Sequence, residues 1–284
     1  MDVKSIIVCP KCRCSLDDKL CCKECNTQYS KYYGVYDIVN PELSSNQEIL
    51  WNITDEDLAN TTNNKERQRT DDDWIKDYFS RKNKETVIAE QKLANKTMEL
   101  LKGLYGDVCD LATGMGSLLQ MILEANNSNI SVVCTDISKG VLAWTKKNKQ
   151  TNDDKVSYVA TDGRYMSIKD NSFDFITSMA AFGNIPESDK VAKELYRILK
   201  ENGKLIIQGL YIEKGSKSFE VAKNLGLEKG LVEEYLVEEL KKAGFKEIIS
   251  TIVDEAVWAE NPYDRIPVAG DIQKFCIIQA KKLL

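Results

Sequence analysis

Strand-like and helix-like segments alternate from residue 105 onward, and this alternation limits the fold more than any other feature. Short runs rich in Val and Ile are each followed by a segment whose apolar residues have helical spacing. Such a pattern is typical of an α/β fold with a mostly parallel sheet covered by helices on both faces. Seven strand-like runs stand at residues 107–112, 130–136, 155–162, 173–180, 204–212, 245–256 and 274–282. No helical segment separates the last two, which predicts an antiparallel final strand.

Residues 1–104, which precede the α/β region, divide into two parts that differ in composition. Residues 1–40 are cysteine-rich and end in an aromatic stretch, which indicates a small module. Residues 41–104 begin with a polar run rich in Asn and Thr and then become helical, so we expect a linker and a helical cap. Residues 105–284 would form the main α/β domain.

Charge and composition narrow the classes of function. The net charge of the 284 residues is −5, whereas nucleic-acid binders usually carry a basic surface that neutralises phosphates. The chain has no histidine, so it lacks the commonest general base and the commonest nitrogen ligand of metals. No apolar run reaches the roughly 20 residues of a membrane-spanning helix. The N-terminal apolar stretch is too short for a signal peptide, and we expect a cytoplasmic protein.

Two Cys-x-x-Cys pairs stand near the N-terminus, Cys9 with Cys12 and Cys22 with Cys25. Four thiolates on two tight turns can surround a tetrahedral metal ion and leave no open position, as in structural zinc sites. A module of this size buries little core, so its folding would be coupled to metal binding.

Other cysteines leave alternatives open. Cys14 and Cys21 are additional thiols, and Cys21 could replace Cys22 as a ligand. Disulfides or a redox role are a competing interpretation, which a cytosolic location disfavours, and cysteines without a special role are a third. Three further cysteines stand singly in apolar runs and are expected in the core: Cys109, Cys134 and Cys276.

A glycine-containing turn follows the first strand of the α/β region and leads directly into a helix. It runs from Asp110 through Gly114 to Gly116, and glycines there allow the backbone to approach a ligand closely. Acidic residues also end the next two strands, Asp136 and Asp162. In a doubly wound sheet these positions share one crevice, where a carboxylate can accept hydrogen bonds from ribose hydroxyls.

The turn differs from a dinucleotide-binding fingerprint. Three residues after Gly116 stands Leu119, where the G-x-G-x-x-G pattern has its third glycine. The carboxylate of Asp110 also disfavours a pyrophosphate and suits a ligand with positive charge, such as a sulfonium with an α-amino group.

At these residues the chain resembles a known family. VCDLATGMG resembles the first motif of class I S-adenosylmethionine methyltransferases, VVCTDIS the second, and VATDGRYMSIKDNSFDFITS the third and fourth. DLATG, with Ala112 where many members have glycine, is closest to the ubiquinone/menaquinone C-methyltransferase branch. The resemblance covers about residues 105–281. It implies a Rossmann-like methyltransferase fold, S-adenosylmethionine as the cofactor, and methyltransferase activity.

The resemblance also implies a cofactor-binding set. The glycine turn would line the methionine end, Asp136 would bind the ribose, and Asp162 would bind the adenine amino group with help from the Gly163 backbone. Met179 and Ala180, after the fourth strand, would lie near the sulfonium. The full set is Asp110, Ala112, Gly114, Gly116, Asp136, Ile137, Asp162, Gly163, Met179 and Ala180.

The cysteine segment resembles zinc ribbons that precede some methyltransferase domains, in its CPxC and CxxC pairs and its tail NTQYSKYYGVYDIV. It partly resembles an RNA methyltransferase family that modifies a guanine in ribosomal RNA, where the fourth ligand is a histidine. Asn26 stands at that position and is a poor ligand. The ribbon resemblance implies a structural Zn²⁺ on Cys9, Cys12, Cys22 and Cys25.

Three functions follow as hypotheses: a methyltransferase of a small molecule, a methyltransferase of RNA or protein that uses the ribbon for recognition, and a cofactor- and zinc-binding protein without turnover. The acidic charge and the quinone-type motif favour the first. Candidate substrate-facing groups are Asn184, Tyr78, Phe79 and Tyr211, the last of which should follow the fifth strand. The aromatic segment 257–271 would cover the substrate or form a surface loop.

Overall fold

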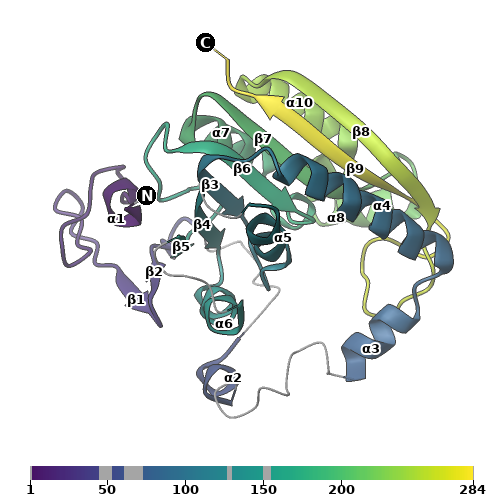
Figure 1. The fold of residues 1–284 in the computed structure, drawn as a ribbon, viewed down its shortest axis with the longest axis horizontal. Coiled ribbons are helices and arrows are strands. Elements are labelled where there is room, and N and C mark those ends of the chain that lie inside the picture. The colour runs from purple at the N-terminus through teal and green to yellow at the C-terminus, as the bar shows by residue number, and fades with distance from the viewer. Residues whose placement is uncertain (1, 45–52, 61–72, 127–129, 150–154, 284) are drawn as a thin grey trace.

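A single mixed sheet organises the molecule in the computed structural model, which describes residues 2–44, 53–60, 73–126, 130–149 and 155–283 (Figure 1). Its nine strands have the order β1-β2-β5-β4-β3-β6-β7-β9-β8. Their bounds are β1 Ser30–Tyr32, β2 Val35–Asp37, β3 Gly106–Leu111, β4 Ile130–Asp136, β5 Val156–Ala160, β6 Phe173–Met179, β7 Leu199–Ile212, β8 Lys246–Val257 and β9 Ile272–Lys281.

The seven strands predicted from residue 105 onward are confirmed, and so is the antiparallel final strand. β5, β4, β3, β6 and β7 are parallel to one another, whereas β9 is antiparallel to both β7 and β8. The order reverses at β3, which has β4 on one side and β6 on the other. In open α/β sheets, ligands bind beside such a reversal, at the carboxyl ends of the strands.

Two strands of the sheet come from the cysteine-rich segment, so the sheet has two strands more than the seven predicted. β2 pairs in parallel with β5, with Tyr36 opposite Val159 and Asp37 opposite Ala160, and β1 completes a hairpin. The two strands are far apart in the sequence and only two residue pairs connect them, so no periodic pattern in the sequence predicts this pairing.

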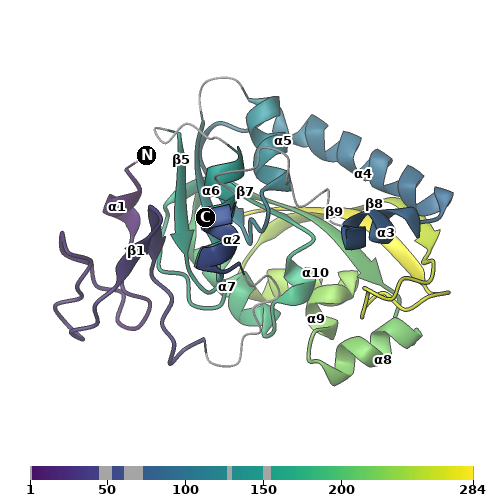
Figure 2. The same ribbon diagram turned by 90° about the horizontal axis from the view of Figure 1, so that it is seen from below.

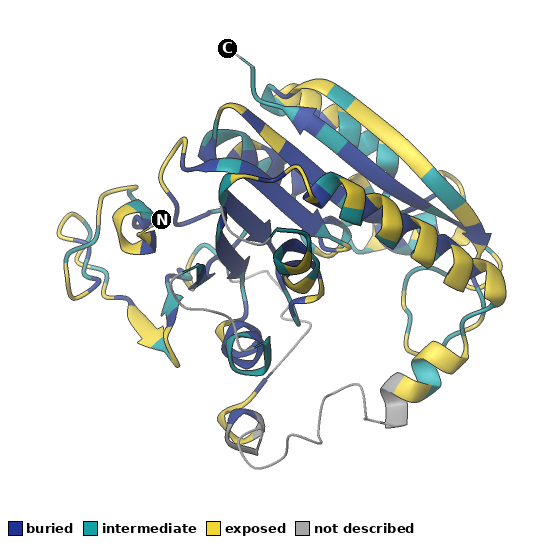
Figure 3. Cartoon of the chain, in the orientation of Figure 1, coloured by how far each residue is buried: buried dark blue, intermediate teal, exposed yellow. Residues whose placement is uncertain are grey.

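Helices cover both faces of the sheet (Figure 2). α4, α5 and α6 contribute to one apolar cluster, and α7 and α10 contribute to the cluster on the other face, together with residues of the cysteine-rich segment. The strands in the middle of the sheet are buried, whereas β8 is exposed along most of its length (Figure 3). The helices are α1 Val3–Ile6, α2 Asp55–Asn60, α3 Asp73–Ser80, α4 Lys84–Leu101, α5 Ser117–Ala125, α6 Lys139–Lys149, the 3₁₀ helix Phe182–Asn184, α7 Ser188–Ile198, α8 Lys217–Asn224, α9 Glu228–Leu231 and α10 Glu233–Ala243.

Two helices, α3 and α4, lie in the part of residues 41–104 that was expected to be helical. Asn83 separates them because its side chain accepts a hydrogen bond from the backbone N–H of Thr86 at 2.8 Å and so begins α4. Much of the expected linker, 45–52 and 61–70, lies outside the described residues. Within the described part of the chain, no helix has the length and apolar character needed to cross a membrane.

Candidate functional site

The glycine turn lies between β3 and α5, and backbone hydrogen bonds join it to the end of β4. The backbone N–H of Gly114 donates to Oδ2 of Asp136 at 3.0 Å, and that of Thr113 donates to the carbonyl of Thr135 at 2.8 Å. Gly116 begins α5 with φ +78°, and a Cβ there would stand 2.6 Å from Cγ2 of Thr145 on α6. Only glycine therefore fits between the turn and α6 without a shift of the packing.

Asp110, the last polar residue of β3, is buried without a partner for its side chain. It is 1% exposed, and neither carboxylate oxygen has a hydrogen bond within the described residues. Burial is the main cause that raises the pKa of Asp110 to about 7; Thr113 lowers this pKa, and the nearby charge of Asp136 makes the smallest contribution, which raises it. Burial of a carboxylate without hydrogen bonds is unfavourable, and a bound cation or a ligand with hydrogen-bond donors would offset this cost.

Asp110→Asn is therefore expected to stabilise the ligand-free protein at alkaline pH. With a pKa of about 7 in the folded state and 3.8 ordinarily, Asp110 binds more protons folded than unfolded, so its contribution to stability falls as pH rises from about 4 to 7. The free energy of unfolding of the variant should exceed that of the parent by about 4 kcal/mol at pH 8, and this difference should shrink towards pH 4. Urea unfolding at pH 5 and 8 measures it.

The matched control is Asp107→Asn, at the other end of the same strand. Asp107 is ion-paired with Lys200 at 3.0 Å and is partly exposed, so its replacement should give no such pH-dependent gain. A gap between Asp110→Asn and parent that is the same at both pH values would show that Asp110 is ionised throughout.

Asp136 ends β4 with both carboxylate oxygens held by backbone groups. Oδ2 accepts from Gly114 and Oδ1 accepts from the N–H of Ser138 at 2.9 Å. Burial raises the pKa of Asp136, and the N–H groups of Ser138, Gly114 and Ile137 oppose this effect. A carboxylate oxygen can accept two hydrogen bonds, so each retains capacity for a hydroxyl donor.

Asp162 follows β5 and has a partner that the sequence analysis missed. Oδ2 of Asp162 accepts from Nη2 of Arg164 at 2.7 Å, and Oδ1 accepts from Nε at 3.0 Å. Both side chains are buried, and Arg164 also donates to Glu187 at 2.9 Å. An arginine two residues after the strand-end aspartate is the one sequence signal that could have suggested this pair.

Met179 and Ala180 lie at the end of β6, beside the end of β3. Met179 is half-buried, Ala180 is exposed, and the Ala180 N–H donates to the carbonyl of Gln208 on β7 at 2.9 Å. The carboxyl ends of β5, β4, β3 and β6 thus present all of the expected cofactor residues along one edge of the sheet. Asn184 is exposed in the 3₁₀ helix that follows.

The aromatic candidates lie in different environments. Tyr211 is within β7, not after it, and is 1% exposed in the core cluster shared with α7 and α10. On α3, Phe79 is 56% exposed, and Tyr78 is half-buried against the loop between β8 and β9. That loop is tied to α3 through Tyr263, whose hydroxyl donates to Asp77 at 3.0 Å.

The structure brings the two Cys-x-x-Cys pairs close together. The sulfur atoms of Cys9, Cys12, Cys22 and Cys25 all lie within 4.8 Å of one another, and none of the nine cysteines forms a disulfide. Zinc–sulfur bonds of about 2.3 Å in a tetrahedron separate the sulfurs by about 3.8 Å, so this set fits the ion. Cys21 is outside the group. Cys109, Cys134 and Cys276 are buried, as expected.

Known proteins resemble the middle of this chain. Residues 109–207 match the family model of the methyltransferase domain. The ubiquinone/menaquinone biosynthesis C-methyltransferase UbiE of Rickettsia typhi is 28% identical over 39% of this chain and 47% of its own length. This chain therefore spans about half the length of the curated relative.

Solved structures share the Rossmann-like methyltransferase fold. Phosphoethanolamine N-methyltransferase 2 of Haemonchus contortus, in complex with S-adenosylhomocysteine, has a TM-score of 0.53 and 21% identity, over 67% of this chain and 53% of that one. The [4+2]-cyclase SpnF has a TM-score of 0.53 and 18% identity, over 67% of this chain and 81% of its own. At such identities the likeness concerns the fold of the methyltransferase domain.

Proposed function

We propose that this chain binds S-adenosylmethionine at the carboxyl ends of β3 to β6 and transfers its methyl group to a small molecule. The observation that carries the proposal is the buried carboxylate of Asp110, without a partner for its side chain within the described residues, beside the backbone-held carboxylate of Asp136. A ligand with an ammonium group and a vicinal diol supplies what both carboxylates need.

Each residue has a role in this arrangement. Asp110 and the turn to Gly116 would hold the amino-acid end, Asp136 and Ile137 the ribose, and Asp162 with Gly163 the adenine. Met179 and Ala180 would border the methyl group, next to the acceptor. The cofactor supplies an electrophilic methyl group already activated by the positive sulfur. The protein's own task is to orient the acceptor in line with the carbon–sulfur bond and to exclude water.

The transfer balances without a redox partner. The bond between methyl carbon and sulfur breaks, its electron pair stays on sulfur, and a new bond forms between that carbon and the acceptor atom. The acceptor's proton leaves to a carboxylate, tyrosine, lysine or water, since the chain has no histidine.

A small-molecule acceptor is favoured by the net charge of −5 and by the matched C-methyltransferases of quinone biosynthesis. The cysteine module supports the same choice because its strand β2 flanks β5, on the far side of β4 and β3 from β6. With strands about 4.8 Å apart, β2 is roughly 19 Å from the strand that would border the methyl group.

We further propose that Cys9, Cys12, Cys22 and Cys25 hold a structural zinc ion. The fit of four sulfurs within 4.8 Å supports this, because a closed set of four thiolates leaves no position for water and thus serves folding.

Calorimetry with S-adenosylhomocysteine tests the proposed function. We expect saturable binding of one molecule per chain, with little dependence on salt, and no binding of NAD, whose pyrophosphate would face Asp110. Binding of NAD in its place would contradict the proposal. The same titration with ribosomal RNA examines the alternative acceptor, for which affinity would fall steeply with added salt.

A further inference from the structure

The cysteine-rich segment is joined to the connection that follows β5, where the adenine residues lie. Ile7 forms an antiparallel bridge with Ile168, flanked by two backbone hydrogen bonds. The N–H of Val8 donates to the carbonyl of Ser167 at 3.0 Å, and the N–H of Lys169 donates to the carbonyl of Ile6 at 2.9 Å. The segment 161–168 therefore packs against the cysteine module on one side.

Arg13 makes the polar part of this contact. It follows Cys12 directly, and its backbone N–H donates to the carbonyl of Cys9 at 2.8 Å, so the first cysteine turn sets its position. Its guanidinium donates to the carbonyl of Met166 and, at 3.0 Å each, to both carboxylate oxygens of Glu194 on α7. Nη2 makes both bonds to Glu194 and Nη1 makes the bond to Met166, so the guanidinium is held by two charge-assisted contacts with the main domain.

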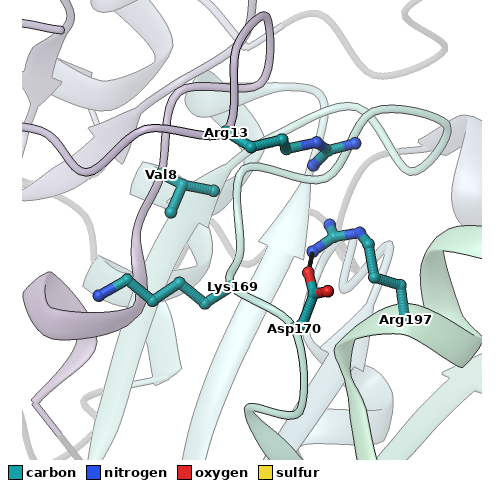
Figure 4. Close-up of a pocket in the computed structure, with 5 residues that line it drawn as sticks. All are labelled: Val8, Arg13, Lys169, Asp170 and Arg197. Atoms are coloured by element: carbon teal, nitrogen blue, oxygen red, sulfur yellow. Dashed lines mark hydrogen bonds and ion pairs between the residues drawn. The ribbon is translucent and has the colours of Figure 1, made fainter.

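Arg197 donates to the same groups, and its side chain lines the same pocket as that of Arg13 (Figure 4). It donates to Glu194 at 2.8 Å and to the carbonyls of Met166 at 3.1 Å and Ile168 at 2.7 Å. The two arginines border a pocket of about 340 Å³ between the module and the main domain. The connection after β5 is thus held between an arginine of the domain and an arginine of the cysteine turn.

The sulfur cluster is part of the same packed core. Cys9 and Cys22 are 0% exposed and belong to one apolar cluster with Met166 and Ile168. The four cysteines are therefore connected to the proposed adenine side through one packed apolar cluster, and a metal ion that orders the cysteines would also order this packing.

The N-terminal part of the chain also contacts the region next to Asp136, the residue proposed to bind the ribose. Lys139, at the start of α6 and three residues after Asp136, pairs with Asp37 of β2 at 2.7 Å. A Cβ on Gly140 would clash with the carbonyl oxygen of Ile53, so the chain beyond the module also packs closely there. The N-terminal part thus borders both halves of the proposed adenosine site.

We propose that the cysteine module is a positioning element for the adenosine end of the cofactor site, with Arg13 as the residue that couples metal loading to cofactor affinity. The inference rests on the proposed function. Asp162 and Gly163 lie at the start of the segment that Arg13 holds, so loss of the contact would let this segment sample conformations that do not bind adenine.

The experiment uses the full chain, loaded with zinc, as parent, Arg13→Ala and Lys11→Ala. Lys11 is the matched control because it lies in the same cysteine turn but pairs with Glu42 on the surface at 2.9 Å. We measure zinc content, the dissociation constant for S-adenosylhomocysteine, and hydrogen exchange of amides 161–168. Glu194→Gln removes the charge that Arg13 pairs with, together with the charge that Arg197 pairs with, and leaves the cysteine turn intact.

We expect Arg13→Ala to retain its zinc, to bind S-adenosylhomocysteine about tenfold more weakly, and to exchange amides 161–168 faster. Lys11→Ala should match the parent, and Glu194→Gln should resemble Arg13→Ala. Parent-like affinity and exchange in both Arg13→Ala and Glu194→Gln would overturn the inference. If the zinc-loaded parent itself binds no S-adenosylhomocysteine, the proposed function fails, and faster exchange in Arg13→Ala would then report a structural contact only.

Discussion

Asp136→Ala is expected to weaken the binding of S-adenosylhomocysteine at least roughly a hundredfold. Its two carboxylate oxygens would each accept a ribose hydroxyl, and hydrogen bonds to a charged group contribute about 1.5–3 kcal/mol each. The change also removes the acceptor of the Gly114 N–H, which holds the glycine turn against β4. Calorimetry at pH 8 measures the loss.

Two further variants separate the ribose contact from the support of the turn. Asp136→Asn keeps one oxygen and should give an intermediate loss. Asp107→Ala, on the neighbouring β3 but at its opposite end, should bind as the parent does because its carboxylate pairs with Lys200. An unchanged dissociation constant for Asp136→Ala would remove Asp136 from the site.

Cys22→Ser is expected to lower zinc affinity at least roughly a hundredfold and to destabilise the cysteine module. Four-ligand zinc sites contribute about 10–16 kcal/mol, so the loss of one thiolate removes several kcal/mol. Cys22 is 0% exposed, and its sulfur lies 3.2 Å from that of Cys12. Elemental analysis of protein purified with reductant should find one zinc per parent chain and little in the variant.

Cys21→Ser is the matched control, one residue away. The sulfur of Cys21 lies outside the four-sulfur group, directed at the carbonyl of Cys22 at 3.9 Å, and its backbone N–H donates to Asp17 at 2.8 Å. Its replacement should leave zinc content and melting temperature unchanged. Loss of zinc in Cys21→Ser but not in Cys22→Ser would reverse the assignment, and parent protein without zinc would remove the metal proposal.

Local patterns in the sequence were sufficient for the framework. The strands at Asp110 and Asp136 are short apolar runs that end in an acidic residue, and a helix follows each. Because parallel strands place their carboxyl ends at one edge, those two carboxylates had to meet near Gly114 once the sheet formed. The spacing of the two Cys-x-x-Cys pairs likewise restricted the candidate metal ligands to a few sulfurs, since a tight turn brings the two thiols of each pair together.

Tertiary structure decided the features that depend on contacts between distant or equivalent residues. In the sequence, Cys21 remained an alternative to Cys22 as a ligand, and it is the fold of the turn that brings the Cys22 sulfur to within 3.2 Å of that of Cys12. The addition of β1 and β2 to the sheet and the contact of Arg13 with Glu194, 181 residues away, correspond to no periodic pattern in the sequence. The periodicity of apolar residues indicates which side of a helix or strand is buried. Polar pairs between distant elements form only after the chain has folded and excluded water from them, so the local pattern does not predict them.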